Sequence, residues 1–208
     1  MADPNNTPVA EEVHSTLGFR DVVIAPLVTD EEGETPEYGA VVPLVAAIDL
    51  DLSDNGGDPD IQYYDDHEGD VIYPDPELQG TLELAALTAE KQALVLGARV
   101  DQFGGLLRNA SDKPPYFALG CKSEMTNGED KYVWFYKARF RMVSEKYTTK
   151  QGKTINRQTA KLQLTCIKRT CDGNWQYSVD SSLAAFATKK AAFFDTVYEP
   201  TFAQNNGG

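Results

Sequence analysis

Apolar and polar residues alternate along several stretches of this chain, which is the pattern of β-strands that bury one face and expose the other. The β-branched run between Phe19 and Leu27 predicts a first strand. Alternation over Ala47–Ser53 predicts a half-buried strand with an acidic open face. Its predicted inner residues are Ile48, Leu50 and Leu52, and its outer residues are Asp49, Asp51 and Ser53. Shorter strands are predicted at Ile61–Tyr64, Val71–Tyr73 and Leu78–Leu84.

The longest alternating segments lie after residue 115. Asn127-Gly128 is a hairpin signal and predicts a turn between strands at Tyr116–Glu124 and Lys131–Met142. The second of these strands alternates throughout, which predicts one apolar face made of Tyr132, Trp134, Tyr136, Ala138, Phe140 and Met142. A strand within Arg157–Arg169 repeats the pattern, with inner residues Ala160, Leu162, Leu164 and Cys166. Asp172-Gly173-Asn174 predicts a turn into a last strand near Trp175–Val179.

Two helices are predicted. Thr88 is a suitable N-cap, Ala89–Leu96 holds helix-forming residues, and Gly97 follows as a stop signal. A second, short helix is predicted at Thr188–Thr196, where it would carry two phenylalanines. Many short strands with turn signals and one or two helices predict a mainly β fold, a β-sandwich or barrel with a flanking α-helix.

We expect one domain over residues 17–202, preceded by a flexible arm at residues 1–16 and followed by a polar tail at residues 203–208. Between the two long strands of the second half lies a basic, glycine-containing segment, Tyr147–Thr154. It is too polar for a core, so the sequence predicts a loop that protrudes at about residues 144–156.

Charge is divided unevenly along the 208 residues, whose formal net charge is −13. Residues 1–99 hold 22 Asp and Glu against 3 Lys and Arg, whereas residues 100–208 hold 10 against 16. The acidic balance argues against a nucleic-acid reader, because such proteins bind phosphates through Lys and Arg. An acidic first half and a basic second half suit head-to-tail contact between copies.

The three cysteines, Cys121, Cys166 and Cys171, have no CxxC spacing, which predicts reduced, structural thiols. The first residues lack the basic and apolar segments of a secretory signal. No apolar stretch is long enough to span a bilayer. We therefore expect a soluble protein, made inside a cell, with no membrane span.

Candidate chemistry is sparse. Asp51–Gly56 approaches a calcium-binding loop, but Gln62 stands where a bidentate Glu is needed and the flanks predict strands, so an acidic turn is favoured. His14 lies in the predicted arm and His67 among carboxylates, where a solvated residue is favoured over a catalyst. Gly104-Gly105 predicts a hairpin turn rather than a phosphate cradle. The sequence contains no HExxH, P-loop, GxSxG or GxGxxG motif, so we expect no enzyme, no metal and no cofactor.

Several segments between Gly18 and Phe202 occur in the same order as in a known protein family. They are Gly18–Leu27, Ala47–Asp51, Gly57–Tyr63, Asp70–Glu77, Asn109–Gly120, Ser144–Tyr147 and Ala191–Tyr198. Together they resemble the major tail proteins, also called tail tube proteins, of long-tailed, non-contractile bacteriophages of Gram-positive hosts.

The resemblance implies a β-sandwich-like subunit that closes into hexameric rings, a fold shared with the tubes of contractile tails and type VI secretion systems. The rings would stack around a tape-measure protein into the tube that carries the genome to the host. Tail terminator and distal tail or baseplate proteins would contact its ends, and phage DNA would cross the lumen without specific binding. The subunit would be assembled in the host cytoplasm and reside in the virion tail, and the family has no catalytic residues.

Two groups of residues are candidates for these contacts. The protruding loop offers inter-subunit candidates, namely Tyr147, Lys150 and Lys153. The acidic first half offers candidates for the surface or the lumen, namely Asp49, Asp51, Asp65 and Asp66.

Two other functions remain open. A virion or surface binding module, such as a tail-tip or adhesin-like domain, predicts a monomer or trimer with an apolar or aromatic ligand patch. A calcium-dependent hydrolase predicts metal-dependent melting and activity.

Overall fold

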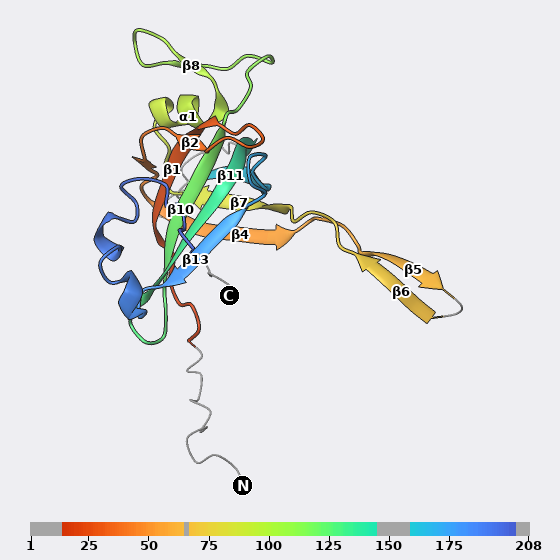
Figure 1. Ribbon diagram of the computed structural model, residues 1–208. Coiled ribbons are helices and arrows are strands. Elements are labelled where there is room, and N and C mark those ends of the chain that lie inside the picture. The colour runs from red at the N-terminus through yellow and green to blue at the C-terminus, as the bar shows by residue number, and fades with distance from the viewer. Residues whose placement is uncertain (1–13, 65–66, 145–158, 203–208) are drawn as a thin grey trace, which may run out of the picture.

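The computed structural model describes residues 14–64, 67–144 and 159–202. Within these ranges the chain is mainly β, with thirteen strands, one α-helix and two short 3-10 helices (Figure 1). Every strand pairing is antiparallel. The predicted mainly β class is confirmed.

Nine of the described strands form one sheet in the order β2-β1-β10-β11-β12-β7-β4, with β3 also paired to β1 and β13 to β11. They are β1 (Arg20–Thr29), β2 (Glu37–Tyr38), β3 (Val42–Pro43), β4 (Ala47–Asp54), β7 (Leu78–Leu84), β10 (Tyr116–Glu124), β11 (Asp130–Ser144), β12 (Ala160–Cys166) and β13 (Gln176–Asp180). β11 is long enough to pair along one edge first with β13 and then with β12.

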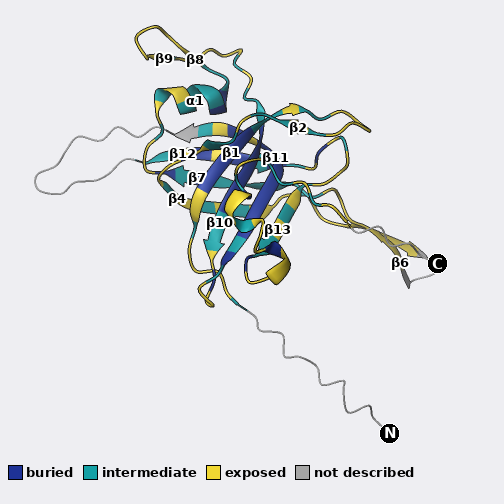
Figure 2. Ribbon diagram, turned by 60° about the vertical axis from the view of Figure 1, so that its left-hand side comes forward, coloured by how far each residue is buried: buried dark blue, intermediate teal, exposed yellow. Residues whose placement is uncertain are grey.

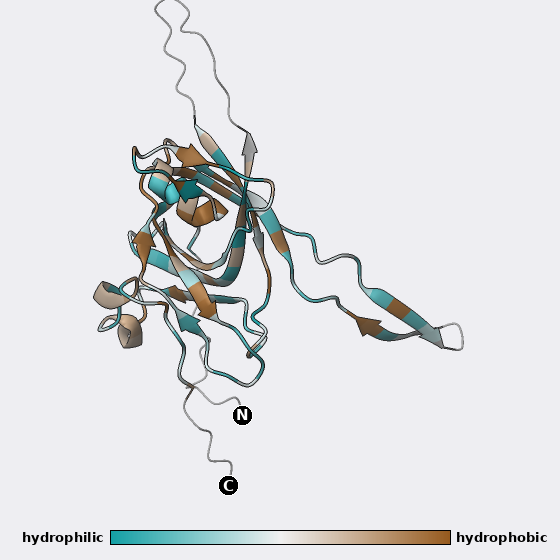
Figure 3. Ribbon diagram, turned by 90° about the horizontal axis from the view of Figure 1, so that it is seen from above, coloured by the Kyte–Doolittle hydropathy of each residue, from teal (hydrophilic) through white to brown (hydrophobic). Residues whose placement is uncertain are grey.

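The sheet is rolled, because the chain passes from one of its edges to the other through a short corner. β3 pairs with β1. The corner begins at Leu44, and β4 starts three residues later and pairs with β7. Ala46 in this corner has a φ of 62°, which lets the chain change direction sharply. Seen from above, the sheet curves around its interior (Figure 3).

The interior of the roll holds the larger of two apolar clusters. Ile24, Leu82, Phe117, Phe140 and Leu164 are fully buried in it, and the buried residues concentrate in β1, β10 and β11 (Figure 2). Cys121 and Cys166 are buried in the same cluster, and burial raises the pKa of both thiols to about 12.

The helix α1 (Ala89–Leu96) packs Val95 and Leu96 into this interior cluster. Its boundaries confirm the sequence prediction. Thr88 Oγ1 accepts a hydrogen bond from the Lys91 backbone N–H at 3.4 Å, and Gly97 ends the helix in the left-handed conformation with a φ of 69°.

A second apolar cluster covers the outside of the sheet, and its position corrects the prediction of one apolar face along β11. Tyr132, Trp134 and Tyr136 face this outer cluster, whereas Ala138 and Phe140 face the interior. Ala138 lies opposite Phe117 and Phe135 opposite Leu119, so β11 carries one extra residue and forms a β-bulge there. Because strand side chains alternate, the bulge moves the following residues to the other face.

The predicted C-terminal helix is also wrong. The segment instead forms two 3-10 turns, η1 (Ala184–Phe186) and η2 (Lys190–Ala192), held by bonds such as Ala192 N–H to the Lys189 carbonyl at 3.2 Å. Phe186 and Phe193 are buried against the ring of Tyr132, with centroids 5.2 Å away in each case. Packing of these rings on the sheet, rather than helical hydrogen bonding, fixes the segment.

Two hairpins stand away from the rolled sheet. β5 (Asp60–Tyr64) and β6 (His67–Ile72) form a long arm between β4 and β7, which projects well beyond the rest of the molecule (Figure 1). β8 (Arg99–Val100) and β9 (Leu106–Leu107) form a small hairpin around Gly104, as the sequence predicted. No helix within the described ranges is long and apolar enough to cross a bilayer.

Candidate assembly surfaces

One face of four neighbouring strands is polar throughout, and we call it the polar face. It is the outer face of β4, β7, β12 and the second half of β11. Strand pairing aligns its side chains in three rows: Arg139, Thr165, Gln79 and Ser53; Arg141, Gln163, Thr81 and Asp51; Lys161, Glu83 and Asp49. The surface is thus acidic at β4, neutral over most of β7 and β12, and basic at β11.

The polar face arises from alternation in each strand. The residues between its members point into the roll and fill the interior cluster, among them Leu52, Leu82, Phe140, Leu162 and Leu164. This confirms the predicted inner residues of β12, and β7 shows the same alternation. It also explains why a whole sheet face can remain polar, since the interior already buries the apolar half of each strand.

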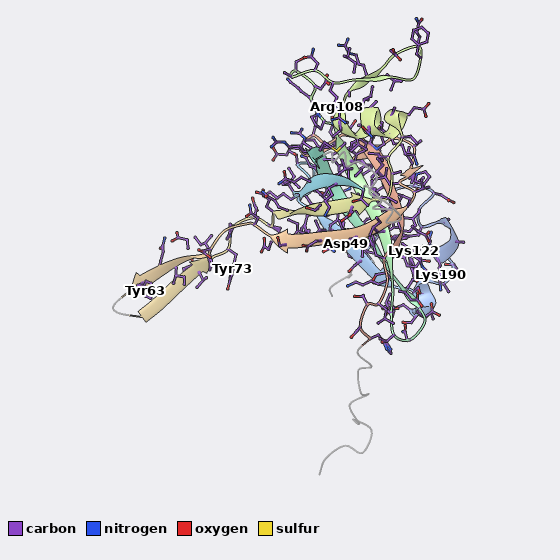
Figure 4. The ribbon with its side chains drawn as sticks, turned by 180° about the vertical axis from the view of Figure 1, so that it is seen from behind. Asp49, Tyr63, Tyr73, Arg108, Lys122 and Lys190 are labelled. Atoms are coloured by element: carbon purple, nitrogen blue, oxygen red, sulfur yellow. The ribbon has the colours of Figure 1, made fainter. Side chains whose placement is uncertain are left out.

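Asp49 and Asp51 are exposed on β4, as predicted (Figure 4 labels Asp49). Ile48 is not inside, as the sequence predicted, but has an exposed fraction of 51%. The register shifts between Ala47 and Asp49, so Ala47 contacts the interior cluster in its place. The other candidates, namely Asp65, Asp66, Tyr147, Lys150 and Lys153, lie outside the described residues, as does most of the predicted loop at about residues 144–156.

The charges of the polar face are only partly neutralised within the chain. Lys161 lies 3.0 Å from Glu83, and hydrogen bonds from Thr159 and Lys161 lower the pKa of that carboxyl. The guanidinium of Arg139 lies over the ring of Tyr116, 3.8 Å from its centroid. Among the residues that the structure describes, Arg139, Arg141, Asp49 and Asp51 form no ion pair.

Both lateral edges of the polar face are open in the described part of the chain. β4 pairs with β7 alone. β10 begins at Tyr116, opposite Arg139, so β11 beyond that residue pairs with β12 alone. A groove of about 680 Å³ extends from this second edge across the polar face to β7, and its lining includes Tyr116, Arg139, Arg141, Gln163 and Gln79. Open strand edges expose unpaired N–H and C=O groups that can bind another strand.

The arm formed by β5 and β6 is the second candidate surface. Tyr63, Ile72 and Tyr73 are exposed by 63%, 53% and 75%, and Figure 4 shows both tyrosines away from the sheet. Residues 55–77 contain acidic side chains but neither Lys nor Arg. At the base of the arm, the Asp75 carboxylate lies 2.7 Å from Lys168 Nζ, just after β12, in an exposed ion pair. A two-stranded ribbon with exposed apolar side chains is marginal alone and gains stability when a partner covers it.

Two buried ionic groups brace the outside of the sheet, and the sequence predicted neither. Arg169, fully buried, binds the carboxylates of Asp172 and Glu199. Asp30 accepts hydrogen bonds from Lys137 Nζ at 2.5 Å and from the backbone N–H groups of Thr170 and Cys171 at 2.8 and 3.0 Å. Burial alone would raise the pKa of Asp30, but these bonds outweigh it and lower the pKa to about 2. The sequence feature that could have indicated the second group is the position of Asp30, the first acidic residue after the buried strand β1.

Within the described residues, no group of three or more His, Cys, Asp and Glu side chains is placed to hold a metal ion. A second groove, of about 560 Å³, lies at the start of β1 and is lined by Lys122 and Lys190 among others. Figure 4 labels both lysines. Both lysines are already paired, Lys122 with Asp21 at 2.9 Å and Lys190 with Glu129 at 2.7 Å.

Comparison of the chain with protein-family models and with curated proteins finds no match.

Proposed function

We propose that this chain is the subunit of a self-assembling tube, a major tail protein of a long-tailed, non-contractile bacteriophage. Its copies close into hexameric rings, and the rings stack into the conduit for the genome. One observation carries the proposal: a polar sheet face is bounded on both sides by open strand edges. In a monomer such edges stay unpaired, whereas a ring closes through them.

Strand directions suit this contact. β4, β7, β12 and β11 alternate in direction, so β4 and β11 run in opposite senses. Identical copies set side by side around an axis therefore bring β4 of one against β11 of the next as an antiparallel pair. Such a contact uses two different patches on each copy, and it closes into a ring when the rotation between copies is right.

In this arrangement the polar face lines the bore. Its Thr, Gln and charged side chains stay hydrated. Asp49, Asp51 and Glu83 balance Arg139, Arg141 and Lys161, so the face offers passing DNA no excess of positive charge. The tape-measure protein occupies the bore during assembly, and tail terminator and distal tail or baseplate proteins cap the ends. The protein acts in the virion tail after assembly in the host cytoplasm, with no catalysis and no cofactor. The arm lies on a neighbouring subunit, where its exposed tyrosines become covered.

The proposal is tested on the full chain by negative-stain electron microscopy and sedimentation velocity over rising protein concentration. We expect rings or tubes with a central bore. A variant in which an Asn-Gly turn replaces residues 58–73 removes the arm but leaves β4 and β7 joined, and it should stay folded while losing stacked tubes. A wild-type chain that remains monomeric at every concentration, also with tape-measure protein present, contradicts the proposal.

The exposed tyrosines of the arm also support a second candidate function, a virion or surface binding module. Aromatic side chains are enriched where proteins bind partners. This alternative predicts a monomer or trimer in which Tyr63→Ser and Tyr73→Ser abolish adhesion to host cells. The tube proposal predicts that the same pair of changes weakens self-association instead.

A further inference from the structure

We infer that Arg141 of one subunit pairs with the carboxylates of Asp49 and Asp51 of the next, and that this ion pair dictates head-to-tail joining of the copies. The inference rests on the proposed tube function and identifies the residues that meet at the seam between subunits. The partner is a second copy of this chain, presenting the open edge of β4.

Arg141 stands at the open edge of β11. Its backbone lies past the start of β10, and its side chain belongs to the exposed polar face. Arg139, two residues earlier, lies opposite Tyr116 and is stacked on its ring. Both arginines line the groove, but Arg141 makes no such ring contact among the described residues. It is therefore the guanidinium most accessible to a strand that joins there.

The opposite edge carries unneutralised acid. Asp49 and Asp51 are exposed on β4, and Asp49 lies opposite Glu83 of β7. Two carboxylates facing each other across strands repel. Lys161 sits on the far side of Glu83 and is already bonded to it at 3.0 Å. A cation arriving at the open edge of β4 would relieve this repulsion.

The two groups cannot reach each other within one subunit. Strand pairing places Arg141, Gln163, Thr81 and Asp51 in one row, with β12 and β7 between the charged ends. Neighbouring strands are about 4.8 Å apart, so Arg141 and Asp51 are separated by about 14 Å. Across a seam that joins β11 to β4 they become neighbours in adjacent strands, at the spacing where opposite charges pair.

The same charges exclude the alternative seams. A two-fold dimer through β4 sets Asp49 and Asp51 against their own copies, and a dimer through β11 sets Arg141 against Arg141. Like charges in direct opposition cost free energy, so both closed dimers are disfavoured. Only the head-to-tail seam brings opposite charges together, and only that seam propagates around a ring.

The test uses charge reversal in the full chain, with assembly followed by sedimentation velocity and electron microscopy. Arg141→Glu alone, and Asp49→Lys with Asp51→Lys, should each raise the protein concentration needed for rings at least tenfold. A 1:1 mixture of the two variants should form rings again, because the two reversed charges then meet at one seam and the native charges meet at the next. Circular dichroism melting verifies that each variant is folded, and Arg141→Gln and Asp51→Asn serve as milder versions.

Matched controls carry the same charge changes elsewhere. Arg99→Glu on β8, and Glu31→Lys with Glu34→Lys in the loop after β1, change exposed residues outside the polar face and should leave assembly unchanged. If wild-type and both seam variants assemble alike, the seam assignment is overturned while the tube function stands. Loss of rings in both variants without rescue in the mixture also overturns it. Failure of the wild type itself to form rings instead counts against the tube function.

Discussion

Arg169 is buried completely, yet its guanidinium binds the carboxylate of Glu199, thirty residues further along the chain. Asp172 holds the other side of the guanidinium, with Nε to Oδ1 at 3.0 Å, and the ring of Tyr136 lies 4.1 Å beneath it. Tyr136 in turn donates its hydroxyl hydrogen to the carbonyl of Tyr198 at 2.8 Å. This arrangement fastens the end of the C-terminal segment to the outer face of the sheet.

Glu199→Ala should therefore destabilise the fold. The change removes two charge-assisted hydrogen bonds from a buried cation, although Asp172 remains, so we expect a loss of about 2 kcal/mol in the free energy of unfolding. Urea unfolding at pH 7 measures this loss, and proteolysis should cut the C-terminal segment faster. Glu34→Ala, an exposed acid with no ion pair in the described residues, is the matched control and should change stability by less than about 0.5 kcal/mol.

Asp30→Asn should make stability less dependent on pH. The folded-state pKa of Asp30 is about 2, below that of an ordinary carboxyl, so its ionised form stabilises the fold above pH 4. That contribution is lost as pH falls from about 5 toward 2. We expect the variant to be less stable by roughly 2 kcal/mol at pH 7 and to approach the wild type near pH 2. A difference that stays constant over this pH range contradicts the assignment.

Gly120→Ala should disturb the outer aromatic cluster. A Cβ at this position would lie 2.8 Å from Phe194 Cε1 and from Val23 Cγ2, and 2.9 Å from Trp134 Cζ3. These rings are packed, so the methyl group forces them apart at a cost of about 1–3 kcal/mol. Thermal melting and the near-ultraviolet circular dichroism of Trp134 report the change. Gly18→Ala, where the nearest heavy atom is 3.5 Å away, should be tolerated.

Calcium should not affect stability. Asp51 lies on an exposed strand, and the Asp54 carboxylate instead accepts a hydrogen bond from the Gly56 N–H at 2.9 Å. We expect Asp51→Asn to leave the melting temperature unchanged, with calcium or with a chelator. A chelator-induced drop in the wild type that calcium reverses and Asp51→Asn abolishes would show a coordination site after all, since such a site fails when one ligand is lost.

The sequence predicted those elements whose signals are local. Thr88 and Gly97 delimit α1 because an N-cap and a left-handed stop act within one turn. Asn127-Gly128 similarly located the turn between β10 and β11, with a φ of 79° at the glycine. The acidic outer face of β4 and the inner residues of β12 were also predicted, one strand at a time.

Features that depend on a partner strand were not predictable from the sequence. The bulge in β11 changes the face of Ala138 and Phe140, but only its register against β10 reveals it. The alignment of Arg141 with Asp51 in one row depends on two intervening strands. The C-terminal segment has ordinary helix-forming residues, and its 3-10 turns arise because the sheet offers aromatic contacts that a helix would lose.

The outer aromatic cluster also determines when folding of the chain can be completed during its synthesis. Trp134 and Tyr132 lie on β11, but the rings that cover them, Phe186, Phe193 and Phe194, come later in the chain and are translated after β11. A nascent chain still missing these residues exposes the aromatic face of its sheet, and such surfaces are prone to aggregate. The outer face of the sheet is therefore protected only after the segment from Phe186 to Phe194 has packed onto it.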